Sequence, residues 1–260
     1  MLALLAVQAV VASGFAPVPD TPYRYRIEQE RDEAGVTRRY VTERTIRFAR
    51  GTDGYVAEMT ITAVDGSLSS GAGAMFERAF AGLRGVPMRY RLSAAGAVIA
   101  VEDRAMLWQR LIDGVIATAG SDPERQATVR RLTAPLAAMP EAQQVAMLGS
   151  MLATVLAPDV VRGGTMAERA IRQEGIGPQG IGTALSGTER VFAQGALLVD
   201  ERRLAGPVAL PGGAKGERVS ELTRSVDPAT GLIVAQQEAI RLTGPSATSR
   251  TVTRITRLEP

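Results

Sequence analysis

Two pairs of adjacent carboxylates are the residues of this chain best suited to catalysis. They are Glu102 with Asp103 and Asp200 with Glu201, and glycoside hydrolysis needs two carboxyl groups at a defined separation. The chain has no cysteine and no histidine, which excludes thiolate nucleophiles, histidine general bases and cysteine-ligated zinc. Either the carboxylates serve a hydrolase that works without these groups, or they are solvated surface acids, as adjacent acids usually are.

Two glycine-rich segments resemble phosphate-binding loops in their amino-acid pattern. Residues 175–180 read GIGPQG, but a dinucleotide-binding loop must follow an apolar strand and open a helix. Here residues 168–174 are charged and helix-like, and residues 181–187 begin a helix poorly. Residues 212–216 contain Lys215 without the following serine or threonine. We interpret both as surface loops and expect no cofactor and no metal site.

The first sixteen residues, MLALLAVQAVVASGFA, carry no charged side chain and lead into Pro17. A short apolar run that ends in small residues is typical of a secretory signal peptide. Ala12, Ser13 and Ala16 suit cleavage, and because Pro17 disfavours a cut after Ala16, Ala12 or Ser13 is preferred. The alternative is a buried N-terminal element of a cytoplasmic protein. We predict a signal peptide over 1–16 and a periplasmic or secreted protein.

Without the first sixteen residues the chain is long enough for one large domain or two small ones, and we predict a single globular domain over residues 17–260. Hydrophobic residues make up 45% of the chain and aromatic residues 4%, so aliphatic side chains must fill most of the core. The net charge is +3, with 30 basic and 27 acidic residues interleaved along the sequence. This near balance predicts an ordinary solvated surface and no nucleic-acid partner. We expect no membrane-spanning segment in the mature chain.

Alternation of period two predicts strands over about 22–101 and 183–260. Turns ending in Gly35, Gly96 and Gly231 join three strand pairs. Between the two strand regions, apolar residues at helical spacing predict about three helices over 103–157, one of them opened by a capping box at Ser121. The fold class is therefore α+β, a curved antiparallel sheet with a central helical insert.

A resemblance follows from the hairpin that closes the second strand region. Residues 227–233, DPATGLI, after a sheet interrupted by helices, resemble the half-barrel domains of lipoprotein carriers and related secreted proteins. The resemblance implies a sheet whose concave face holds an acyl chain or lipid, and it transfers no functional residue.

The third predicted helix carries an apolar stripe that is the candidate ligand site, through Met147, Leu148, Met151 and Val155. Methionine lines adaptable apolar pockets and also fills ordinary cores, so both interpretations stand. The leading hypothesis is a non-enzymatic, exported cell-envelope protein that binds an apolar or lipid-like ligand. A carboxylate-dependent hydrolase and an interaction module without a small ligand are the alternatives.

Overall fold

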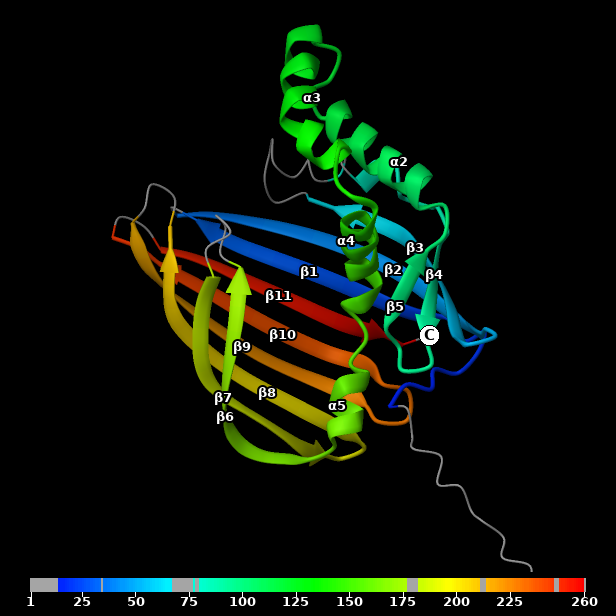
Figure 1. Cartoon of the computed structure of the whole chain (residues 1–260), viewed down its shortest axis with the longest axis vertical. Helices are drawn as coiled ribbons and strands as arrows, with labels where there is room; N and C mark the ends of the chain where they lie inside the picture. The colour runs from blue at the N-terminus through cyan, green and yellow to red at the C-terminus, as the bar shows by residue number, and fades with distance from the viewer. Residues whose placement is uncertain are drawn as a thin grey trace, which may run out of the picture.

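The protein is built on one open antiparallel sheet, seen in a computed structural model that describes residues 14–33, 35–66, 77, 80–176, 182–210, 214–245 and 248–259. The sheet has eleven strands in the order β5-β4-β3-β2-β1-β11-β10-β9-β8-β7-β6 (Figure 1). The strands are β1 (Tyr23–Glu33), β2 (Val36–Arg50), β3 (Gly54–Asp65), β4 (Met88–Ser93), β5 (Val98–Val101), β6 (Met166–Ile176), β7 (Gly182–Gln194), β8 (Leu197–Ala209), β9 (Lys215–Asp227), β10 (Leu232–Thr243) and β11 (Thr248–Leu258). The predicted antiparallel sheet is thus confirmed.

The first and last strands of the chain lie side by side in the middle of the sheet. β1 pairs with β2 on one edge and with β11 on the other, so residue 24 lies opposite residue 258. The alternation in β1 and β3 has the predicted sense, because Tyr25 and Met59 are both fully buried on the face that carries the helices. Gly35, Gly96 and Gly231 end their turns at positive φ, as the hairpin pattern requires.

Four helices lie between β5 and β6 in the described chain: α2 (Arg104–Ala117), α3 (Pro123–Ala137), α4 (Glu141–Ala153) and α5 (Pro158–Gly163). The Asp122 side chain caps α3 by accepting the backbone N–H groups of Glu124 and Arg125. Figure 1 shows α4 and α5 in front of the sheet, with α2 and α3 beyond its upper edge. None of the helices over the described residues is long and apolar enough to cross a membrane.

The main apolar core lies between the β1–β5 half of the sheet and helices α2 and α4. Its largest members come from both layers, and Leu148 and Leu152 of α4 meet side chains of β1 to β4 there. Burial of this apolar surface supplies most of the stability of such a layer. A second, smaller cluster joins α5 to the other half and contains Ala157, Val160, Val191, Val226 and Ile233.

Strands resume earlier than the sequence pattern predicted. Residues 168–174, interpreted as helix-like, belong to β6, which begins at Met166 rather than near residue 183. β6 is an edge strand that pairs with β7 alone. Polar residues such as Glu168 and Arg169 occupy both of its faces and are exposed, so no alternation marks it. The helical region also holds a fourth helix, α5, where about three helices were predicted.

The tight approach of β7 and β8 depends on a glycine. A Cβ atom added at Gly187 would lie 1.8 Å from the backbone oxygen of Arg203 on the neighbouring strand. A glycine within a strand commonly marks such a bend or close backbone approach. β7 and β8 therefore approach each other at Gly187 more closely than a side chain there would allow.

Candidate functional site

The four residues predicted to bind a ligand occupy two different environments on and after α4. Leu148 and Val155 are fully buried in the main apolar core, and Met151 packs against that core while half-buried. Met147 points to solvent and is 42% exposed. The stripe thus packs on the sheet through three of its four members. None of the four lines the two grooves or the cavity that are described below.

An apolar groove lies on the adjacent face of the same helix. It has a volume of about 430 Å³ and runs between α4 and the turn and first strand residue of the β4–β5 hairpin. This size lies within the range of roughly 300–1,000 Å³ typical of small-molecule sites. We call it the α4 groove; its lining residues are Gly96, Ala97, Val98, Val145, Ala146, Gly149, Ser150, Ala153, Leu156 and Pro158.

Small side chains along one face of α4 form this groove. Gly149 lets the helix approach the hairpin, because a Cβ atom there would lie 3.1 Å from the Val98 side chain. The Ser150 hydroxyl donates to the carbonyl oxygen of Met147, within its own helix. Its polarity is therefore satisfied locally. Ala146 and Ala153 lie on either side of these residues and are exposed. The floor and walls of the groove are thus apolar or internally bonded.

α4 is tied to the sheet below by a buried arginine. Arg44 of β2 is 8% exposed, and its guanidinium donates a hydrogen bond to the carbonyl oxygen of Met151. Burial lowers the pKa of Arg44 to about 10, against a smaller opposing effect of Tyr90. Among the described residues, its Nε has no hydrogen-bond partner. This contact fixes the C-terminal half of α4 over the sheet and so positions the α4 groove.

Leu156 and Pro158, just before and at the start of α5, border one end of the groove. Ala157 donates its N–H to Gly231, and Val155 accepts from Ile233, so the chain before α5 pairs with the start of β10. The Arg162 guanidinium donates to the carbonyl oxygen of Ala95 at 3.2 Å. These contacts hold α5 against both the sheet and the hairpin.

A chain of ion pairs on the helix-facing side links β6 to α5. Its N–O distances are 2.9 Å from Arg169 to Glu189, 2.5 Å from Glu189 to Arg202, 3.9 Å from Arg202 to Asp200, 2.7 Å from Asp200 to Arg224 and 3.0 Å from Arg224 to Asp159. We call this series the inner ion-pair chain. Asp200 is 0% exposed. Burial acts to raise the pKa of Glu189, but hydrogen bonds from Arg169 and Arg202 outweigh it and hold that pKa below its usual value.

A cavity of about 210 Å³ lies beside the inner ion-pair chain. Asp159, Arg169, Glu189 and Arg224 line it together with apolar and glycine residues of α5, β6 and β7. Each of the four charged groups already has a partner of opposite charge. The cavity therefore presents no unmet charge to a ligand, and the ion pairs serve to hold α5 on the sheet.

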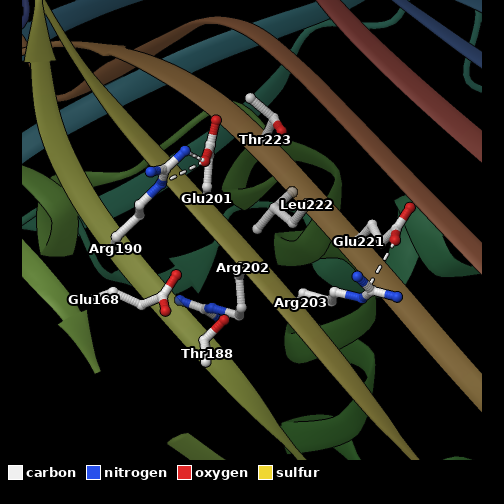
Figure 2. Close-up of a pocket in the computed structure, with 9 residues that line it drawn as sticks. All are labelled: Glu168, Thr188, Arg190, Glu201, Arg202, Arg203, Glu221, Leu222 and Thr223. Atoms are coloured by element: carbon white, nitrogen blue, oxygen red, sulfur yellow. Dashed lines mark hydrogen bonds and ion pairs between the residues drawn. The ribbon is translucent and has the colours of Figure 1, made fainter. Parts of the chain in front are cut away.

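A second, polar groove lies on the opposite face of β7, β8 and β9. Figure 2 shows its lining, in which Arg190 pairs with Glu201 and Arg203 with Glu221, at 2.5 and 3.5 Å. Side chains alternate along a strand, so Glu201 and Arg203 point away from the face on which Asp200 meets α5. We call this the outer groove. Its volume is about 460 Å³, and its exposed, paired charges are typical of a solvated sheet surface.

The structure separates the carboxylate pairs that a hydrolase would need. Asp200 and Glu201 point to opposite faces of β8, the first to Arg224 and the second to Arg190. Glu102 and Asp103 follow β5, and between β5 and β8 lie β4, β3, β2, β1, β11, β10 and β9. The two predicted pairs are therefore not brought together. Glu102 pairs with Arg89 at 3.5 Å instead.

The two glycine-rich segments lie only partly within the described residues. Residues 177–181 and 211–213, in the two glycine-rich segments, fall outside the described residues, while Lys215 begins β9. Within the described ranges, no group of three acidic, histidine or cysteine residues could hold a metal ion. The chain matches no known protein-family model and no curated protein sequence.

The sequence pattern missed the residues that line the α4 groove. The signal that could have found them is the spacing of Ala146, Gly149, Ser150 and Ala153, which repeats at three and four residues and places small side chains on one helical face. Among the predicted residues, Leu148 and Val155 fill the core and Met151 packs against it, while Met147 is exposed. The small residues leave the space of the groove.

Proposed function

We propose that this chain is an exported cell-envelope protein, periplasmic or secreted, that binds one acyl chain of a lipid-like ligand in the α4 groove without catalysing a reaction. The observation that carries the proposal is the groove itself, with its volume of about 430 Å³ and its lining of small and aliphatic side chains. Apolar cavities of this size exclude water at little cost and favour apolar ligands.

The shape of the sheet supports the same proposal. We take the sheet as half-barrel-like and the helices as the insert of a single α+β domain over residues 17–260, with the α4 groove opening between insert and sheet. The uncharged run over residues 1–16 supports export. The two carboxylate pairs lie apart in the sheet. The α4 groove is therefore a better-supported functional site than a hydrolytic centre.

A fluorescence titration with a dansyl-labelled fatty acid tests this function. We expect micromolar binding by the wild-type protein, and we expect Ala146→Trp to weaken it at least about tenfold, or about 1.4 kcal/mol, because the indole would fill the groove. Ala146 is exposed, so the substitution spares the core. Gln143→Trp is the matched control, since residue 143 is exposed on the same helix and does not line the groove.

The titration distinguishes the proposed function from its alternatives. A wild-type protein that binds no probe at micromolar concentration contradicts the proposal and favours an interaction module without a small ligand. Equal binding by Ala146→Trp and wild type contradicts the placement of the ligand in the α4 groove. Circular dichroism of each variant shows whether the fold is retained.

A further inference from the structure

An arginine without an acidic partner stands at the α5 end of the α4 groove. Arg162 lies one helical turn after Pro158, a lining residue of the groove, and so on the same face of α5. Its guanidinium donates to the carbonyl oxygen of Ala95 at 3.2 Å. Ala95 directly precedes Gly96, which also lines the groove. The Arg162 side chain therefore spans from α5 to the β4–β5 turn beside the two residues that border this end.

The aliphatic part of the Arg162 side chain is held in place by packing. A Cβ atom at Gly14 would lie 2.7 Å from the Arg162 Cγ and 2.6 Å from the carbonyl oxygen of Pro158. The chain at Gly14 thus packs directly against the arginine and the start of α5. Arg162 as a whole is exposed, so its charged head reaches water from a fixed stem.

Most of the hydrogen-bonding capacity of Arg162 is unused. A guanidinium presents a fork of N–H donors, and among the described residues Arg162 makes only the bond to Ala95 and no ion pair. The nearest acidic residue in the sequence, Asp159, pairs with Arg224 at 3.0 Å. The described part of the chain therefore leaves the positive charge at this end of the groove without a counter-charge.

The opposite end of the groove also has an arginine nearby, but its charge is neutralised. Arg104 pairs with Glu141 at 3.3 Å and donates to the side-chain oxygen of Gln144. Gln144 directly precedes Val145 of the groove lining, and the lining residues themselves carry no charge. The groove is thus apolar along its length, with an unpaired positive charge only at the end near α5.

We propose that the α4 groove binds a single acyl chain whose head is an anionic oxygen group, a carboxylate or a phosphate, held by Arg162. This inference rests on the proposed function, binding of an acyl chain in the groove, and names the class of ligand. A guanidinium binds both head groups through paired N–H···O bonds. From Val145 to Ala153 the groove follows α4 for about 12 Å, which an extended chain of about ten bonds covers.

The charge of the head group distinguishes this proposal from a plain apolar groove. Without a cation, such a groove favours a neutral alcohol over the ionised acid of the same chain length, because the acid would lose water of hydration. An unpaired arginine at the end of the groove reverses that order. Since Arg162 is exposed, we expect the reversal to be modest, about fivefold in affinity.

Calorimetric titration of the wild-type protein with decanoate, decyl phosphate and decanol tests the proposal. At low salt we expect at least one of the two acids to bind about fivefold more tightly than decanol, and we expect this preference to shrink at high salt. The tighter acid identifies the source as a free fatty acid or a phosphate-headed lipid, and either result supports an anionic head. Decanol that binds as tightly as both acids at low salt overturns the proposal.

Substitution of Arg162 tests whether this residue holds the head group. We expect Arg162→Gln to abolish the preference for the acids and Arg162→Lys to keep part of it, because lysine retains the charge without the paired geometry. Arg125→Gln is the matched control, since Arg125 is an exposed arginine of α3 that does not line the groove, and it should keep the full preference. A preference that survives in Arg162→Gln overturns the assignment.

The comparison of probes on one protein sample separates a specific effect from a structural one. Loss of the bond to Ala95 could weaken the groove for all three probes, but it would leave their ratio unchanged. Failure of the proposed function also looks different. A wild-type protein that binds none of the probes rejects both the acyl-binding function and the anionic head, whereas equal binding of all three rejects the anionic head alone.

Discussion

The two halves of the sheet hold their helices by different interactions on the same face. In the β1–β5 half, α2 and α4 pack through a large apolar core that includes Tyr25, Met59 and Leu148. In the β6–β9 half, a small apolar cluster is joined by the inner ion-pair chain, in which Arg224 bridges buried Asp200 and Asp159 of α5. The half of the sheet with the large apolar core is therefore also the half in which an apolar groove is found.

Charge explains why the β6–β9 half has no comparable apolar site. Its inner cavity and its outer groove are both lined by arginine and glutamate side chains in ion pairs. Moving these charges out of water costs more than their attraction returns unless each is paired. An acyl chain that entered either site would remove the ion pairs from water and would provide no polar contacts in place of the water. In the α4 groove an acyl chain would meet mainly apolar side chains.

The largest expected effect tests the buried ion pair. Arg224→Met leaves Asp200 without its 2.7 Å partner at 0% exposure, so we expect the free energy of unfolding to fall by about 3 kcal/mol. Arg203→Met removes a 3.5 Å pair with Glu221 on the outer face, where both side chains are more than half exposed, and we expect almost no loss. Urea denaturation of both variants measures the difference. Equal losses would show that the two faces do not differ in this way.

A smaller effect tests the close approach of β7 and β8 at Gly187. Gly187→Ala places a Cβ atom 1.8 Å from a backbone oxygen of β8, and because backbone cannot give way cheaply, we expect a loss of about 2 kcal/mol. Gly163→Ala in α5 is the control, since a Cβ atom there meets nothing within 4 Å. Thermal unfolding should show a melting temperature lower by about 6 °C for the first variant and unchanged for the second. A tolerated Gly187→Ala would argue that the close approach of the two strands does not depend on this glycine.

The smallest effect concerns acid. The folded-state pKa of Glu189 lies below its ordinary value of 4.5 because Arg169 and Arg202 donate hydrogen bonds to it against the opposing effect of burial. Its stabilising contribution is therefore complete above that ordinary value and is lost as the pH falls through the lower, folded-state pKa. We expect Glu189→Gln to melt about 3 °C below wild type at pH 7, with the gap closing at acid pH. A gap that stays constant down to pH 3 would argue against this linkage.

The strand regions with one buried face could be predicted from sequence because alternation is local. Tyr55, Ala57, Met59 and Ile61 alternate with Val56, Glu58 and Thr60, and all four are buried as expected. β6 could not be predicted in the same way, because as a polar edge strand it buries neither face and its alanine, arginine and glutamate favour helices locally. Of the residues predicted to bind a ligand, Leu148 and Val155 lie in the main apolar core, and the ligand role of the stripe stays a prediction.

Residue types alone established that the chain lacks cysteine and histidine chemistry, that its first sixteen residues carry no charge, that its strands lie toward both ends and that helical spacing lies between them. These follow from residue type and from contacts between neighbours in the chain. Tertiary structure alone decided the pairing of β1 with β11, the burial of Phe15 beside Tyr55 and the groove between α4 and Val98. Each of these joins residues far apart in sequence, and such contacts depend on the packing of whole elements, which no local pattern records.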